Sequence, residues 1–159
     1  MSKNKIKVLF ICLGNICRSP TAHGVFLHKV TEAGLGHRIE VDSAGTAAYH
    51  VDKAPDRRAV AAAARRGFDL TPLRARKAIP EDFLEYDYIL AMDRQNIEDM
   101  KRITPAGYPG HFGLLMGFAG EPDVEVPDPY YGEDHGFERV LDMVEKASNG
   151  LLKEIEARL

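Results

Sequence analysis

The sequence has only two cysteines, and both lie in one short segment, at positions 12 and 17. A bond between Cys12 and Cys17 would close a very small ring, so these residues cannot form the framework of a secreted disulfide-rich domain. The pair therefore points to chemistry or to redox sensing rather than to a structural cross-link.

Long hydrophobic runs are also missing. The most apolar N-terminal segment, residues 6–13, is far shorter than the roughly 20 residues of a membrane-spanning helix. It also lacks the small-residue cleavage site of a signal peptide. Hydrophobic residues make up 45% and charged residues 28% of the chain, as in ordinary globular proteins. We expect a cytoplasmic protein that does not insert into membranes.

Basic residues are not in excess. The 21 lysines and arginines face 24 acidic residues, which gives a net charge of -3. Such a chain offers no broad attraction to nucleic acid or to anionic lipid, so any bound anion must be held by local groups. We find no plausible metal-ligand partner for any of the six histidines at helical or hairpin spacing, so we predict no metal site.

The length of 159 residues suits one domain, and we interpret residues 1–159 as a single unit. Apolar runs predict strands at 6–12, 39–44 and 86–92, with a weaker one at 112–118 that contains Gly113 and Gly117. Helical patterns are found at 19–33, 55–67, 94–103 and 136–159. The alternation predicts an α/β fold: a four-stranded parallel sheet with helices on both faces. Ligands of such sheets bind beyond the carboxyl ends of the strands.

Residues 13–17 link the first strand to the first helix and lie at such an end. Gly14 permits a positive φ, and Asn15 tolerates a left-handed conformation, so the loop can curl tightly. Its backbone N–H groups and the helix N-terminus can then converge on one anion. The nucleotide-binding sequence G-x-x-x-x-G-K-[ST] does not occur. We therefore predict a different phosphate loop, formed by Leu13, Gly14, Asn15, Ile16 and Cys17.

Cys12 and Arg18 flank this loop. The planar guanidinium of Arg18 can contact two phosphate oxygens at once, which a lysine cannot. Amides, helix dipole and guanidinium would together stabilise a thiolate at Cys12, making it a nucleophile at neutral pH. Alternatively, Cys12 is a buried apolar residue and Arg18 a solvated charge. The strand before the loop and the helix after it favour the phosphate site.

A proton donor for such a nucleophile is found far along the chain. Pro127 and Pro129 bracket Asp128 and stiffen its loop. The neighbouring Tyr130 and Tyr131 would partly desolvate the carboxyl and favour its protonated form, as general-acid catalysis requires. The alternative is a plain turn with two surface tyrosines.

These motifs closely resemble the low-molecular-weight protein tyrosine phosphatases. The segments that carry the likeness occur in that family's order and span nearly the whole chain: VLFICLGNICRSPTAHGVF, VDSAGT, PDRRAV, ARKAIPEDF, YDYILAMDRQN and PDPYYGEDHGFE. The resemblance implies hydrolysis of phosphotyrosine and small aryl phosphates through a cysteinyl-phosphate intermediate. Cys12 would attack phosphorus, Arg18 would bind its oxygens, and Asp128 would protonate the leaving group and then activate water. No metal or cofactor is required, because Arg18 and the loop amides compensate the transition-state charge.

Supporting roles follow from the same resemblance. Ser19 would donate to the Cys12 sulfur, although it also suits a helix cap, and Ser43 would orient Asn15. A phenyl ring would lie between cleft walls that favour phosphotyrosine: Leu13, Tyr49, Tyr130 and Tyr131. The chain departs from the family pattern at Tyr49, where many members have tryptophan. It also departs at His23, where glutamate is common, and at Leu73, where some have histidine.

Three points stay open at the level of sequence. Cys17 could pair with Cys12 under oxidation and make the enzyme redox-sensitive, or simply pack beneath the loop. Thioredoxin-coupled arsenate reductases share this loop but need further cysteines, and none follows Cys17. A non-catalytic phosphate-binding module could lose Cys12 or Asp128, yet both are present. We expect phosphotyrosine-containing proteins as partners, and a monomer or weak homodimer.

Overall fold

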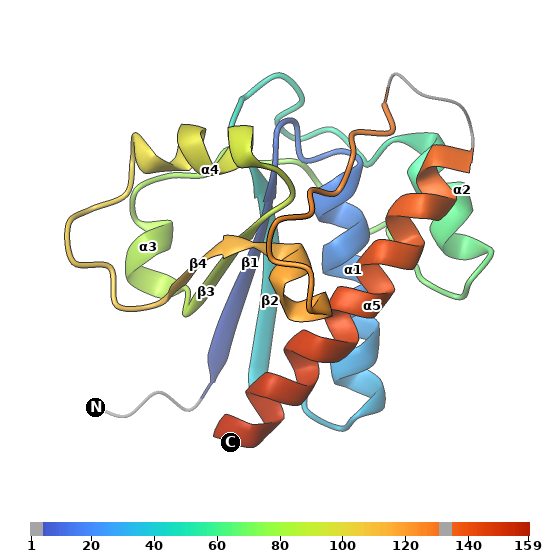
Figure 1. Ribbon diagram of the computed structural model, residues 1–159. Coiled ribbons are helices and arrows are strands. Elements are labelled where there is room, and N and C mark those ends of the chain that lie inside the picture. Colours follow the sequence, from blue (N-terminus) through green and yellow to red (C-terminus); the bar gives the residue numbers. More distant parts are fainter. Residues whose placement is uncertain (1–4, 131–134) are drawn as a thin grey trace.

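Four parallel strands form the centre of the fold (Figure 1). The computed structural model describes residues 5–130 and 135–159. Its strands are β1 (Ile6–Cys12), β2 (Ile39–Gly45), β3 (Tyr88–Ala91) and β4 (His111–Leu114). They are arranged in the order β2-β1-β3-β4, and each neighbouring pair is parallel. The predicted parallel sheet is confirmed.

Helices cover both faces of the sheet, as predicted (Figure 1). The helices are α1 (Arg18–Glu32), α2 (Arg57–Ala64), α3 (Asp82–Glu85), α4 (Arg94–Lys101) and α5 (His135–Arg158). Because side chains alternate along β1, Val8 and Phe10 pack with α1, α2 and α5, whereas Leu9 and Ile11 pack with α3 and α4. All four β1 side chains are fully buried, as their continuous apolar run requires.

The fourth predicted strand is too long. β4 ends at Leu114, and a 3₁₀ helix, η1 (Leu115–Ala119), follows where a strand was expected. Pairing with β3 ends at Ala91↔Leu114, the last residue of β3, so no ladder partner extends β4. The single-turn helix α3 was not predicted, because four residues are too few to show a helical period.

Helix α5 packs closely on η1 at Gly150. A Cβ at this position would lie 1.8 Å from the carbonyl oxygen of Phe118. The same helix buries Ser148, whose hydroxyl has no hydrogen-bond partner among residues 5–130 and 135–159. Because η1 leads into the segment at 120–130, the contact at Gly150 helps to fix where that segment begins.

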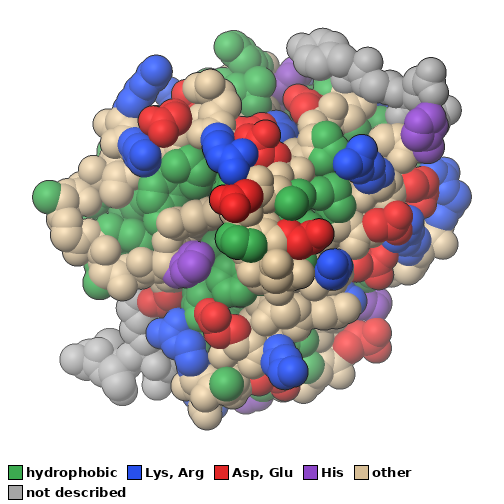
Figure 2. Space-filling view, in the orientation of Figure 1, with side chains coloured by type: hydrophobic (Ala, Val, Ile, Leu, Met, Phe, Trp, Pro, Cys, Tyr) green, Lys and Arg blue, Asp and Glu red, His purple; other side chains and the backbone are tan. Residues whose placement is uncertain are grey.

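The surface mixes charges of both signs. Figure 2 shows Lys and Arg side chains interspersed with Asp and Glu side chains over the visible face, without a continuous basic region there. Within residues 5–130 and 135–159, no helix is long and apolar enough to cross a membrane.

Two substitutions on α5 test its packing. We expect Gly150→Ala to lower the free energy of unfolding by about 2 kcal/mol or more, since overpacking outweighs the roughly 1 kcal/mol of helix propensity that alanine gains. Ser148→Ala removes an unpaired buried hydroxyl and is expected to cost nothing or to stabilise by up to about 1 kcal/mol. Urea denaturation of both variants measures the difference. Equal destabilisation by the two substitutions would contradict this packing.

Candidate active site

The loop after β1 winds around the sulfur of Cys12. The Asn15 backbone N–H donates to Cys12 Sγ at 3.3 Å, and Ser19 Oγ lies 3.0 Å from the same sulfur. Asn15 Nδ2 donates to Ser19 Oγ at 2.8 Å, which leaves the hydroxyl proton of Ser19 for the sulfur. Cys12 is only 2% exposed, so these donors act on it in a largely dry setting.

The tight curl of the loop depends on Asn15. Its φ of 56° confirms the predicted left-handed conformation. The expectation that Gly14 also uses a positive φ is wrong. Gly14 instead makes room for a neighbour, because a Cβ there would lie 2.9 Å from Cδ2 of His50. Glycine at this position therefore serves close packing.

The end of β2 supports the loop from the side. Thr46 N donates to the Cys12 carbonyl at 2.9 Å, and Ala47 N donates to the Leu13 carbonyl at 3.0 Å. A Cβ on Gly45 would lie 2.8 Å from the Leu13 oxygen. Gly45 thus lets the backbones of β2 and the loop approach each other, a role that the sequence analysis missed.

Arg18 begins α1 and is 3% exposed. Its Nη1 donates to Asp93 Oδ2 at 2.6 Å and to the Val126 carbonyl at 3.1 Å. Its Nη2 lies 3.8 Å from Asp128 Oδ2. Burial alone would lower the pKa of Arg18, but Cys12, Asp93 and Asp128 raise it above its usual value. The buried guanidinium therefore stays charged beside the sulfur.

Asp93, which the sequence analysis missed, holds Arg18 from the end of β3. Its carboxylate also caps α4 by accepting from Asn96 N at 2.8 Å, while Asn96 Oδ1 accepts from Asp93 N at 3.1 Å. This capping box orients the Asp93 carboxylate independently of its contact with Arg18. The sequence did contain a signal for this role of Asp93. The residue comes just after a buried strand, and the carboxyl ends of parallel strands, including the one before the loop, lie on the same side of the sheet.

Asp128 borders the same cleft, and its side chain is 34% exposed. Its Oδ1 accepts from the backbone N–H of Tyr130 at 2.9 Å. The Tyr130 ring lies near His50, with 6.4 Å between ring centroids, and near the Arg58 guanidinium at 5.5 Å. The described contact of Tyr130 with Asp128 is thus through its backbone. Tyr131 lies outside the described residues.

These groups border one cleft of about 290 Å³. Cys12, Arg18 and Asp128 line it, and its predicted walls Leu13 and Tyr49 do as well. Tyr49 is 75% exposed, so its ring stands at the cleft mouth. Tyr130 joins the lining as predicted, as do Gly14, Ile16 and Cys17 from the loop. His50 was missed, because nothing in the sequence near it suggests contact with the loop.

Ser43 does not contact Asn15 as expected. Its hydroxyl is 2.9 Å from Nδ1 of His23, which is buried. The Asn15 carbonyl oxygen instead accepts from Arg76 N at 3.1 Å. The Ser43 hydroxyl therefore hydrogen-bonds to the ring of His23. At this position the family often has glutamate. Ser43 therefore does not orient Asn15 through a direct hydrogen bond.

Arg76 is anchored on both sides. Its guanidinium forms two 3.1 Å hydrogen bonds to Asp82, and its Nε donates to Asp42 on β2 at 3.1 Å. Burial lowers the pKa of Arg76, but the two carboxylates outweigh this and raise it. Gly45 N donates to the Arg76 carbonyl at 2.8 Å. The backbone that orients Asn15 is thus fixed against the sheet.

Cys17, the last residue of the loop, is a free, buried thiol that borders the cleft. Burial raises its pKa, and the nearby Asp56 carboxylate and Cys12 raise it further. Cys17 is therefore a poor nucleophile at neutral pH. A disulfide between Cys12 and Cys17 under oxidation stays a prediction.

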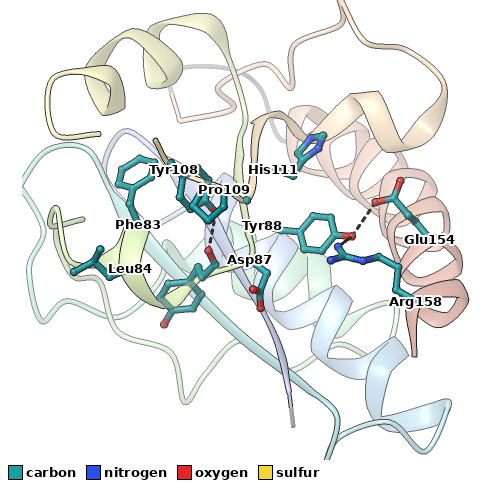
Figure 3. Close-up of a pocket in the computed structure, with 11 residues that line it drawn as sticks. Phe83, Leu84, Asp87, Tyr88, Tyr108, Pro109, His111, Glu154 and Arg158 are labelled. Atoms are coloured by element: carbon teal, nitrogen blue, oxygen red, sulfur yellow. Dashed lines mark hydrogen bonds between the residues drawn. The ribbon is translucent and has the colours of Figure 1, made fainter. Parts of the chain in front are cut away.

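A larger hollow, of about 550 Å³, lies at the opposite end of the strands from the Cys12 loop, where β3 and β4 begin (Figure 3). There the Tyr88 hydroxyl donates to Glu154 at 2.9 Å and accepts from Arg158 at 2.5 Å. Tyr108 donates to the Tyr86 carbonyl at 2.7 Å. These polar groups satisfy one another, and no cysteine lines the hollow. The smaller cleft, with Cys12, is the better candidate for chemistry.

The fold and the loop define a class of protein: an α/β domain that presents a cysteine and an arginine at an anion-binding loop. Residues 7–159 match the family model described as low molecular weight phosphotyrosine protein phosphatase, and the chain belongs to this family.

Relatives and solved structures agree over nearly the full length. The Schizosaccharomyces pombe low molecular weight phosphotyrosine protein phosphatase is 42% identical, covering 98% of this chain and 99% of the relative. The human protein of that name is 36% identical, covering 92% and 94%. A protein tyrosine phosphatase crystal structure from Entamoeba histolytica, with Hepes in its active site, has a TM-score of 0.90 and 36% identity, covering 98% and 100%.

The close approach at Gly45 gives a test of the loop. We expect Gly45→Ala to weaken binding of inorganic phosphate by about tenfold or more, because the Leu13 carbonyl must move. Gly36→Ala is the control, since no atom of the described residues lies within 4 Å of a Cβ there. Isothermal titration calorimetry measures both affinities. Unchanged affinity in Gly45→Ala would show that the loop tolerates the side chain.

Buried His23 should make stability depend on pH. Burial lowers its pKa, although Asp42 opposes and Arg76 adds to the effect. In the unfolded chain histidine titrates near ~6.5, so near and below this pH the unfolded state binds more protons at His23 than the folded state does. The free energy of unfolding therefore falls from about pH 7 towards 5, by at most about 1.4 kcal/mol per unit from this group.

The variant His23→Gln should lose this part of the slope. Urea denaturation at several pH values measures it for both proteins. Parallel curves for the two proteins would contradict the assignment.

Proposed function

We propose that this chain hydrolyses phosphotyrosine, with Cys12 as nucleophile, Arg18 as phosphate-binding group and Asp128 as general acid and base. One observation carries the proposal: the Cys12 sulfur is held by the Asn15 N–H and the Ser19 hydroxyl, in the same cleft as Arg18 and Asp128. The family to which the chain belongs supports the reaction class.

In the first step the Cys12 sulfur attacks phosphorus and forms an S–P bond. The bond from phosphorus to the tyrosyl oxygen breaks, and protonated Asp128 gives its proton to that oxygen. Arg18 and the loop N–H groups compensate the charge on the phosphoryl oxygens. Asp93 keeps the Arg18 guanidinium in place while this charge develops.

In the second step Asp128, now ionised, takes a proton from water as the water oxygen attacks phosphorus. The S–P bond breaks, and inorganic phosphate is released. The Ser19 hydroxyl and the Asn15 N–H stabilise the departing sulfur. These are the same contacts that hold the sulfur before the reaction, so the loop serves both steps.

The cleft walls favour an aryl phosphate. The Leu13 side chain and the exposed Tyr49 ring can flank a phenyl ring, with Tyr130 on the other side. Proteins that carry phosphotyrosine are the partners that such a cleft suits. We infer a cytoplasmic enzyme that acts as a monomer or weak homodimer.

Kinetics of p-nitrophenyl phosphate and of phosphotyrosine peptides test the roles. Cys12→Ser should lower kcat at least about a thousandfold, because the nucleophile is lost. Asp128→Asn should lower kcat by about 10²–10⁴-fold, the usual contribution of general acid–base catalysis. Asp123→Asn is the matched control in the same segment: its side chain is 97% exposed, and activity should persist.

Full turnover by Cys12→Ser would refute the mechanism. A parent protein that binds phosphate but does not turn over either substrate would instead indicate a non-catalytic phosphate-binding module. Comparable losses in Asp123→Asn and Asp128→Asn would show that the effect of Asp128 is structural.

A further inference from the structure

A second hollow, of about 330 Å³, adjoins the catalytic cleft and shares Leu13 and Tyr49 with it. We call it the side groove. Its lining includes the charged residues Lys77, Asp99 and Arg102. A ligand whose aromatic ring lies against Leu13 and Tyr49 in the cleft therefore has the side groove on the other side of the same wall.

The side groove is built from ordered elements. Lys77 forms a parallel bridge with Gly45 at the end of β2, and Ala78 N donates to the Gly45 carbonyl at 2.8 Å. Asp99 belongs to α4, and Arg102 is the residue that caps its C-terminus. Both cations are thus placed by the sheet edge and by a helix end.

The two cations of the side groove differ from Asp99 in their hydrogen-bond partners. The Asp99 carboxylate accepts from Gln95 at 3.0 Å and from Thr46 at 3.4 Å. The exposed side chains of Lys77 and Arg102 have no hydrogen bond or ion pair within the described parts of the chain. Lys101, by contrast, pairs with Glu98 at 3.2 Å. The groove therefore offers two uncommitted positive charges on a chain whose net charge is -3.

We propose that the side groove binds acidic side chains next to the phosphotyrosine of a protein substrate. This rests on the proposed function, because the phosphotyrosine must occupy the cleft for its neighbours to reach the groove. An extended peptide advances roughly 3.3–3.6 Å per residue, so residues within a few positions of the phosphotyrosine cross the wall of Leu13 and Tyr49. Lys77 and Arg102 then pair with their carboxylates.

A nucleic acid is a poorer fit for the same groove. Sequence-independent binding to a phosphate backbone needs many cationic contacts, and Asp99 would lie against the backbone. An acidic peptide needs only one or two pairs, and it brings its own anchor in the phosphotyrosine.

The test compares affinities in a Cys12→Ser background, so that peptides are not consumed. Two series of phosphotyrosine peptides carry glutamate on the N-terminal or on the C-terminal side, each with a glutamine counterpart. We expect about threefold to twentyfold tighter binding of the glutamate peptide in at least one series, as two exposed ion pairs would give. The preference should shrink as ionic strength rises.

The double variant Lys77→Glu/Arg102→Glu should abolish or reverse that preference. Its matched control is Arg139→Glu/Lys153→Glu, which makes the same charge change at exposed positions of α5, on the opposite face of the sheet. Fluorescence polarisation measures all affinities, and the ratio of glutamate to glutamine peptide is compared within each variant.

Loss of the ratio in the groove variant, with the ratio kept in the α5 variant, supports the inference. Two results overturn the inference. One is that Cys12→Ser alone binds the glutamate and glutamine peptides equally in both series. The other is that the Lys77→Glu/Arg102→Glu variant still prefers the glutamate peptide. Turnover of phosphotyrosine peptides by the protein with Cys12 intact is scored separately. If phosphotyrosine peptides are hydrolysed but glutamate peptides are not preferred, only the role of the side groove is rejected. If glutamate peptides are preferred but none is hydrolysed, the proposed function is rejected.

Discussion

The site depends on a buried positive charge. Arg18 is almost fully enclosed, and an enclosed guanidinium is stable only when carboxylates and carbonyls satisfy it. Asp93 and the Val126 carbonyl do so from segments that lie 75 and 108 positions away in the chain. The same contacts bring Asp128 to the cleft. The buried guanidinium of Arg18 therefore brings the nucleophile and the proton donor together around itself.

The parallel sheet makes this assembly possible. β1 and β3 are neighbours and point the same way, so the loop after Cys12 and the capping residue Asp93 emerge side by side. β2 ends on the other side of β1, and its last residue, Gly45, lets the backbone touch the loop. Arg76 then orients Asn15 through its own backbone. The chemistry of Cys12, at the end of β1, is thus supported by the ends of the two neighbouring strands, β2 and β3.

The sequence could predict the parts of the site that are local. Cys12, Asn15 and Arg18 lie within one strand–loop–helix segment, where spacing alone determines which groups meet. Asp93 and Arg76 could not be assigned in the same way, because their roles depend on contacts with residues 75 and 61 positions away. Strand identity was readable from apolar runs. The end of β4 was not, because it is set by the length of its partner β3.

The central claim is that the Cys12 sulfur carries the phosphoryl group between the two steps. Rapid quenching during turnover of a phosphotyrosine peptide, followed by mass spectrometry of the peptide that contains both cysteines, tests this most directly. The account predicts one phosphoryl group, attached to Cys12 and absent from Cys17. A phosphoryl group found on any other side chain during turnover would contradict it.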